Sequence, residues 1–301
     1  MTTPIPITIS LPEYSFELVK PRAVSPTSSL STESLPKYES VIDSCLDSFH
    51  PTRLLQIEAA GHPLVALPCT PPPNPIYIHA VSPTGDVLEP LYLSLRGSRS
   101  SNNSVLVRAS DPSETPLCST TYRRGPGKPP KIQLHGAAVS DSDDLDTCSS
   151  ASAHKKGEEA GEEDDVTITV SSRGITTRAQ IMQTQLGTFA WRFASREERR
   201  DAAADNLLVL ERITTVKGNK QEHRHRVAQL VRNAEFRSAG SNKRTAGNGG
   251  RLMLDLSQWA DSKGEAEQIE ALALASCLVM LKKEVDRRRA LQVAVIISVV
   301  T

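Results

Sequence analysis

The sequence predicts a mainly β protein, in which a closed antiparallel barrel of about 12 strands surrounds a hydrophobic helix near the C-terminus. Two observations support this fold class. Short runs rich in Val, Ile, Leu, Tyr and Thr recur between residues 51 and 256, and Gly, Pro, Asn and Ser separate them, as in all-β domains. Residues 269–281 are apolar on every face of a helix, so they need an enclosing protein. This run is well short of the ~20 residues of a membrane span, so the strands are expected to enclose it.

The helix is the clearest single element of the sequence. After Gly264 the chain has no Gly or Pro up to residue 289, acidic residues come first and basic residues come last. Acids near the N-terminus and bases near the C-terminus complement the helix dipole. The acids are Glu265, Glu267 and Glu270, and the bases are Lys282, Lys283, Arg287, Arg288 and Arg289.

Alternation of apolar and polar residues places the strands. In Phe189, Trp191 and Phe193 the rings occupy every second position, which puts them on one face of a sheet. A short helix is expected at 196–203. So many strands would leave exposed edges in an open sheet, and closure into a barrel removes these edges. Strands are expected at 53–58, 63–67, 76–82, 91–96, 105–108, 118–123, 131–135, 166–170, 181–185, 187–193, 207–213, 226–231 and 251–256.

Composition divides the chain into four parts. Residues 1–48 are rich in Ser, Thr and Pro and are expected to be a disordered arm, and residues 49–290 are expected to form the barrel with its central helix. Within the barrel, residues 139–165 are acidic and rich in Ser, which predicts a disordered insertion. Residues 291–301 form an apolar tail, either a last strand or an exposed, aggregation-prone segment.

No motif of an enzyme or of a metal site is recognisable, so we expect neither catalysis nor a cofactor. His223 and His225 share one face of a strand, but no third ligand is near them in sequence. Cys277 lies in the apolar helix, where a core role is expected rather than a nucleophilic one. The N-terminus lacks a secretory signal, and the cysteines are scattered, so we expect reduced thiols in the cytosol or nucleus, with a cytoplasmic location preferred. We also expect a monomer. The cysteines are Cys45, Cys69, Cys118, Cys148 and Cys277.

A basic segment is the first candidate binding surface. Between Arg173 and Arg251 bases outnumber acids, and each base near an acidic leaflet contributes about 1 kcal/mol of attraction. The alternative is an ordinary solvated surface that the acidic insertion partly neutralises. Nucleic acid is not expected, because stacking aromatics are scarce. Residues 247–250 contain three glycines but lack the spacing of a phosphate-binding loop, so a flexible hairpin loop is expected. The candidate lipid-binding residues are Arg192, Arg196, Arg199, Arg200, Lys243 and Arg244.

The N-terminal arm carries a second candidate, the sequence Leu-Pro-x-Tyr in two copies. Such a segment favours an extended turn and presents a ring to an aromatic groove, as WW-domain ligands do. Two weak sites on one arm gain from effective concentration, although a short motif also arises by chance in such sequence. This reading predicts a cytosolic adaptor that recruits WW-domain ubiquitin ligases. The motif residues are Leu11, Pro12, Tyr14, Leu35, Pro36 and Tyr38.

Several late segments resemble a group of uncharacterised fungal proteins: residues 187–193, 207–211, 227–231, 248–256 and 275–289. Their order of barrel and then helix is in turn similar to the tubby C-terminal superfamily, which includes LURP-one-related proteins and phospholipid scramblases. The resemblance implies a twelve-stranded barrel around a hydrophobic helix, and a binding module for anionic phospholipid head groups at a membrane surface. No individual lipid-contacting residue can be matched to this sequence.

Overall fold

A computed structural model describes residues 49–66, 74–98, 101–122, 128–135, 166–174, 177–215, 222–262 and 264–300. The predicted arm at 1–48, with both Leu-Pro-x-Tyr motifs, and the predicted acidic insertion at 139–165 lie outside the described residues. The predictions about them therefore stay predictions.

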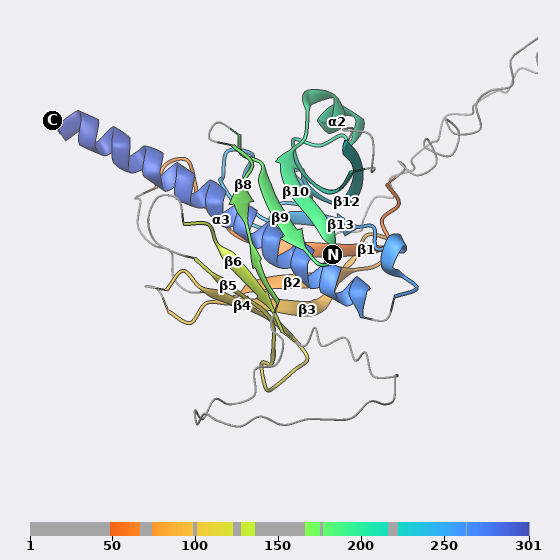
Figure 1. The fold of residues 1–301 in the computed structure, drawn as a ribbon. Helices are drawn as coiled ribbons and strands as arrows, with labels where there is room; N and C mark the ends of the chain where they lie inside the picture. Colours follow the sequence, from red (N-terminus) through yellow and green to blue (C-terminus); the bar gives the residue numbers. More distant parts are fainter. Residues whose placement is uncertain are drawn as a thin grey trace, which may run out of the picture. The chain divides into compact units, whose positions relative to one another are not determined.

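All described strands belong to one antiparallel sheet of 13 strands (Figure 1). Most begin and end within a few residues of the predicted positions. They are β1 (Arg53–Glu58), β2 (Ile76–Val81), β3 (Val87–Leu95), β4 (Ser104–Arg108), β5 (Pro116–Thr121), β6 (Lys131–Leu134), β7 (Val166–Thr169), β8 (Ser171–Ser172), β9 (Gln180–Thr184), β10 (Gly187–Phe193), β11 (Asn206–Thr215), β12 (Glu222–Arg232) and β13 (Gly250–Leu254).

The order of the strands makes the sheet a nearly closed barrel. The strands β1 to β7 are sequential neighbours, the strands β8 to β13 are too, and β13 pairs with β1. This leaves β7 and β8 as the two edges. Only the buried Val170 separates them in sequence, so the chain itself crosses the seam from one edge to the other. The predicted mainly β barrel is confirmed, with 13 strands and a seam in place of full closure.

The strand predicted at 63–67 is wrong. His62, just before this segment, makes an isolated bridge with Ala246, and the described residues 63–66 belong to no strand. Pro63 has no N–H group for a ladder, and Leu64 and Val65 are exposed, so no buried face holds the segment in a sheet.

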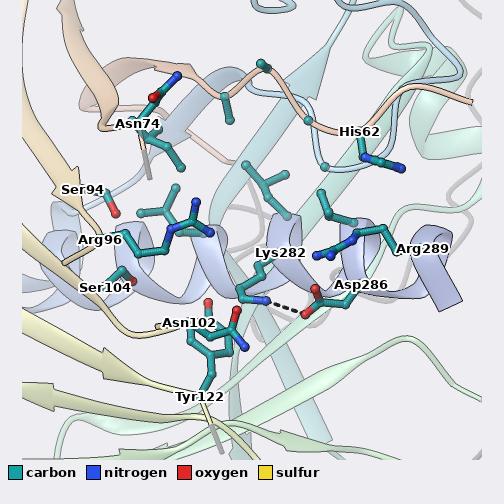
Figure 2. A pocket seen from close by; sticks show the side chains of 18 residues that line it. His62, Asn74, Ser94, Arg96, Asn102, Ser104, Tyr122, Lys282, Asp286 and Arg289 are labelled. Atoms are coloured by element: carbon teal, nitrogen blue, oxygen red, sulfur yellow. Dashed lines mark hydrogen bonds and ion pairs between the residues drawn. The ribbon is translucent and has the colours of Figure 1, made fainter. Parts of the chain in front are cut away.

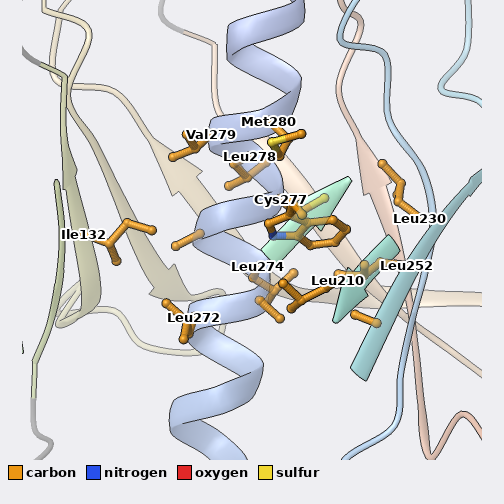
Figure 3. Packing of buried hydrophobic residues seen from close by; sticks show 14 of the residues in the cluster. Ile132, Leu210, Leu230, Leu252, Leu272, Leu274, Cys277, Leu278, Val279 and Met280 are labelled. Carbon is orange, nitrogen blue, oxygen red and sulfur yellow. The ribbon is translucent and has the colours of Figure 1, made fainter. Parts of the chain in front are cut away.

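The helix α3 (Glu265–Val300) passes through the barrel, as the sequence predicts. Figure 3 shows Ile132 of β6 on one side of the helix and Leu210, Leu230 and Leu252 of β11, β12 and β13 on the other. The helix is therefore enclosed from opposite walls. A buried hydrogen bond fixes its position, since Trp191 Nε1 donates to Ser276 Oγ over 2.8 Å.

The helix does not end at the rim of the barrel. It continues to Val300, so the predicted last strand is wrong, and residues 291–300 are the last turns of α3, which project beyond the strands (Figure 1). The alternative of an exposed apolar segment agrees with the exposure of its large side chains. Two short helices complete the described structure, α2 (Arg196–Asp201) and the 3-10 helix η1 (Ser257–Trp259). Ser195 and Glu198 form a capping box at the start of α2, which confirms the short helix predicted there.

Candidate functional site

A cavity of about 210 Å³ lies where α3 leaves the barrel (Figure 2). Its walls come from α3, from the segment after β1, from β2 to β4 with the residue that follows β3, from Tyr122 after β5, and from the loop between β12 and β13. The lining residues are Ala59, Ala60, Gly61, His62, Asn74, Ile76, Ser94, Arg96, Asn102, Ser104, Tyr122, Gly247, Leu278, Leu281, Lys282, Val285, Asp286 and Arg289.

Two glycines let the loops at this end approach α3. Gly247 has φ +66°, and a Cβ there would lie 2.4 Å from the carbonyl oxygen of Leu281. Gly61 has φ +69°, and its Cβ would lie 2.6 Å from the carbonyl oxygen of Ala246. Only glycine fits at these close contacts, so the loop is packed and buried. The predicted loop between two strands is present, since residues 247–249 lie between the antiparallel strands β12 and β13, but it is buried against α3 and not open to solvent as a flexible loop would be.

The same loop does not form a phosphate cradle, because its backbone donors have protein partners. The N–H of Gly247 donates to Glu284 Oε2 over 2.9 Å, and the N–H of Gly249 donates to the carbonyl oxygen of Ala59 over 2.8 Å. The glycines serve close packing.

A buried ion pair holds α3 at this rim. The guanidinium of Arg232, on β12, is only 1% exposed and makes two hydrogen bonds of 2.8 Å to the carboxylate of Glu284. Arg232 also donates to Asn206 Oδ1 over 2.8 Å. Buried pairs of this kind are costly to break, because one charge is then left in a poor solvent. The pair fixes which turn of α3 faces the cavity.

Lys282 and Tyr122 form one wall of the cavity. The Lys282 ammonium lies 2.7 Å from Asp286 Oδ2 and 4.9 Å from the centre of the Tyr122 ring. Burial, and secondarily the charge of Asp286, raises the pKa of Tyr122, so its phenol stays neutral at physiological pH. The ring thus offers Lys282 a cation–π contact, and the neutral phenol adds no negative charge to the cavity.

Two arginines reach into the cavity from opposite sides of the view in Figure 2. Burial lowers the pKa of Arg96, and the positive charge of Arg289 lowers it further. Among the lining residues the charged groups are Arg96, Lys282 and Arg289 against Asp286, which is three positive charges against one negative, a net charge of +2. The cavity is an environment that favours an anion.

The floor of the cavity is apolar. Leu278, Leu281 and Val285 of α3 and Ile76 of β2 line the cavity together with the charged groups, while Ser94, Ser104 and Asn102 add hydroxyl and amide groups. Arginine donates in a planar fork that matches phosphate and carboxylate oxygens. The arrangement can hold a small anion with carbon attached to it, and its volume is below the roughly 300–1,000 Å³ of sites for drug-sized ligands.

The structure places the six predicted lipid-binding residues on three elements, which are β10, α2 and the loop between β12 and β13. Arg192 lies on β10 within an ion-pair network: it makes two hydrogen bonds of 2.7 Å to Glu198 and one of 2.8 Å to Glu211. Hydrogen bonds from Arg192 lower the pKa of Glu198 to about 2. Arg224 and Arg226 pair with the same glutamates, so carboxylates on α2 and β11 match much of the predicted basic surface.

The other five predicted residues lie outside the ion-pair network of Arg192. Arg196, Arg199 and Arg200 lie on α2, and Lys243 and Arg244 are exposed in the loop between β12 and β13. Arg192 and Arg199 line a hollow of about 510 Å³, which Arg178 and Phe193 also line.

The cavity cations were not among the predicted residues. Lys282 and Arg289 are seven residues apart, so they lie on one face of a helix, and this spacing is a signal that the sequence does contain. Arg96 gives no such signal, because its approach to residue 289 depends on the path of the barrel strands.

The described residues include two cysteines, Cys118 and Cys277, and both are buried. Cys277 is buried, which confirms its core position, and burial raises the pKa of Cys118 and of Cys277 to about 12. His223 and His225 both lie on β12, two residues apart as predicted. Within the described residues, no group of three or more His, Cys, Asp or Glu side chains is arranged to hold a metal ion.

Comparisons of the chain with protein-family models, with curated proteins and with solved structures found no match. Of the helices in the described part of the chain, none has the apolar length that crossing a membrane requires.

Proposed function

We propose that this protein is a non-enzymatic module that binds the anionic head groups of phospholipids at a membrane surface. The observation that carries the proposal is the cavity at the barrel rim, which Arg96, Lys282 and Arg289 line together with apolar side chains. The cavity lies at the base of the projecting end of α3.

The charge pattern favours a phosphorylated or otherwise anionic ligand. Burial and the positive charge of Arg289 both disfavour the charged form of Arg96, and an anion bound in the cavity would favour that form. Charge-assisted hydrogen bonds from guanidinium groups to phosphate are about twice as strong as neutral ones. A lipid whose head group has no net charge would gain much less binding energy from these arginines.

The size and the floor favour a head group with its adjoining carbons. The cavity is too small for a whole lipid, and its leucine and valine side chains suit carbon atoms better than water. The resemblance to the tubby C-terminal superfamily, whose members include binders of phosphoinositide head groups, favours the same ligand class by analogy of architecture.

The test is co-sedimentation of the full chain with vesicles. Phosphatidylcholine vesicles are compared with vesicles that also contain phosphatidylinositol bisphosphate, at low and at physiological salt. We expect salt-sensitive binding to the anionic vesicles alone, and a loss of about tenfold or more in the double variant Arg96→Gln, Arg289→Gln. The control is Arg108→Gln, a partly exposed arginine of β4 that does not line the cavity.

One result would assign the binding site to another surface, and another would contradict the proposal. Full binding by the double variant, together with loss of binding when Arg196, Arg199 and Arg200 are replaced by Glu, would place the site on α2. Equal binding to neutral and anionic vesicles would contradict a head-group module altogether. The adaptor function stays a prediction, because Tyr14 and Tyr38 lie outside the described residues.

A further inference from the structure

The end of α3 beyond the barrel exposes a concentration of apolar surface. Five large apolar side chains in this part of the helix are 42–60% exposed. Elsewhere in the described structure such exposure is confined to pairs or single residues. The five residues are Leu291, Val293, Val295, Ile296 and Ile297.

These side chains surround the helix and do not form a stripe. Each residue of an α-helix turns by about 100°, so positions 291, 293, 295, 296 and 297 are distributed over the whole circumference. A second helix or a protein groove buries one apolar stripe of a helix. A helix that is apolar on every side needs an apolar medium on every side.

The length of this segment fits half of a bilayer. At 1.5 Å per residue, residues 291–300 extend about 15 Å, and the hydrocarbon core of a bilayer is about 30 Å thick. The segment therefore reaches through the acyl region of one leaflet.

A basic collar precedes the apolar end. The eight residues from 282 to 289 contain five bases and two acids, which gives a charge of +3. Bases at this position complement the phosphates of an anionic membrane surface. The bases of the collar are Lys282, Lys283, Arg287, Arg288 and Arg289.

A second segment supports the base of the projecting helix. His62 Nε2 lies 2.8 Å from Gln292 Oε1, and Gln292 Nε2 donates to the carbonyl oxygen of Leu64 over 3.0 Å. Leu64 and Val65, which are 48% and 92% exposed, therefore lie beside the first apolar turn of the projecting end. The exposed apolar surface is thus built from two segments of the chain.

We propose that the end of α3 from Leu291 onward, together with Leu64 and Val65, inserts into one leaflet of an anionic membrane. The basic collar then lies among the phosphates, and the adjacent cavity opens at the level of the head groups. This inference rests on the proposed function for its choice of membrane, but it assigns a different surface and a different mode of attachment.

Depth-dependent quenching tests the insertion. In the full chain, Ile296→Trp adds an indole at the projecting end, while Trp191 and Trp259 are buried in the barrel at 0% and 3% exposure. Tryptophan is preferable to a thiol label because the chain has five cysteines. With vesicles of phosphatidylcholine and phosphatidylserine that carry bromine on the acyl chains, we expect strong quenching of the added fluorescence. The matched control Leu88→Trp, on exposed β3, should not be quenched; absence of quenching in both variants would overturn the proposal.

A second pair of variants separates insertion from head-group binding. Val295→Ser with Ile296→Ser should lower affinity for anionic vesicles by about tenfold or more, yet leave binding of the soluble, deacylated phosphoinositide head group unchanged. Arg96→Gln should weaken the soluble head group but leave acyl-chain quenching on phosphatidylserine vesicles intact. If both variants still bind the soluble head group as well as the wild type does, the cavity site is contradicted, and insertion is unaffected.

The oligomeric state provides the remaining outcome. Light scattering of the wild type and of the double serine variant, without membranes, should give the same mass. A wild-type dimer that becomes a monomer on the serine substitutions would show that a second copy covers this surface, and it would overturn insertion.

Discussion

The two halves of α3 have the same kind of surface and opposite surroundings. Residues 269–281 and residues 291–297 are both apolar around the whole helix, but the large apolar side chains of the first half are at most 8% exposed, and those of the second half are at least 42% exposed. The difference is the barrel, which encloses the first half and ends before the second. Composition fixes what surroundings a helix needs, and only the tertiary structure shows whether the protein supplies them.

Charged residues mark the boundary between the halves. Lys282 pairs with Asp286, Glu284 pairs with the buried Arg232, and Lys283 contacts Gln180 Oε1 at the start of β9. These contacts hold the helix at the rim, so the enclosed half cannot slide out and the exposed half cannot withdraw.

The largest effect is expected at the rim. Glu284→Gln keeps the volume of the side chain but leaves the guanidinium of Arg232 buried without its counter-charge. We expect a loss of about 3–5 kcal/mol in the free energy of unfolding, measured with urea. Asp286→Asn breaks the more exposed pair with Lys282 and should cost less than about 1 kcal/mol. Equal losses would mean that the buried pair does not hold the helix.

The next effect compares the two halves directly. Leu274→Ala removes a fully buried side chain and should cost about 2–5 kcal/mol, because it leaves a cavity inside the barrel. The same change at Leu291 should alter stability by no more than about 0.5 kcal/mol in the absence of membranes. A large loss at Leu291 would show that the projecting half is covered in solution.

A smaller effect is expected for the hydrogen bond inside the barrel. Ser276→Ala leaves the indole N–H of Trp191 buried without an acceptor, which should cost about 1–3 kcal/mol. Ser298→Ala, on the projecting half, removes only an exposed local bond and should have no measurable effect. Thermal unfolding of the two variants tests the contrast.

The smallest effect concerns alkaline pH. Burial, and then the charge and hydrogen bond of Glu270 on α3, raise the pKa of Tyr92 from 10.0 to about 12. The folded state keeps this proton longer, so the stability that Tyr92 contributes is complete below pH 10.0 and is lost as the pH rises through about 12.

The stability difference between wild type and Tyr92→Phe should therefore shrink by about 1 kcal/mol per pH unit in this range. Urea unfolding at a series of alkaline pH values measures this difference. Tyr77→Phe, on the exposed face of β2, is the control and should show a constant difference. A constant difference for Tyr92→Phe would mean that the helix does not shield this phenol.

Much of the fold could be predicted because its signals are local. The alternation of Phe189 and Trp191 sets β10, and the apolar run at 269–281 requires an enclosure. The segment at 63–67 has the composition of a strand but no buried face, and the sequence alone does not show this. The glycines at 247–250 predict a loop, whereas their actual role depends on the approach of α3.

The candidate site was harder to predict, because its charges come from distant segments. The excess of bases in its segment made Arg192 a candidate, but Glu198 of α2 and Glu211 of β11 form ion pairs with it. The cavity instead combines Arg96 with Arg289, which are 193 positions apart in the chain. Net charge over a window does not show which bases face carboxylates.

The sequence by itself determined a mainly β chain, a helix that is apolar on every side, and a run of bases after its enclosed half. These properties follow from periodicity and composition over a few neighbouring residues. The tertiary structure decided where the barrel ends along the helix, which arginines meet at its rim, and that the last turns of α3 are exposed. Those outcomes depend on strand register and on contacts between distant residues, which no local pattern encodes.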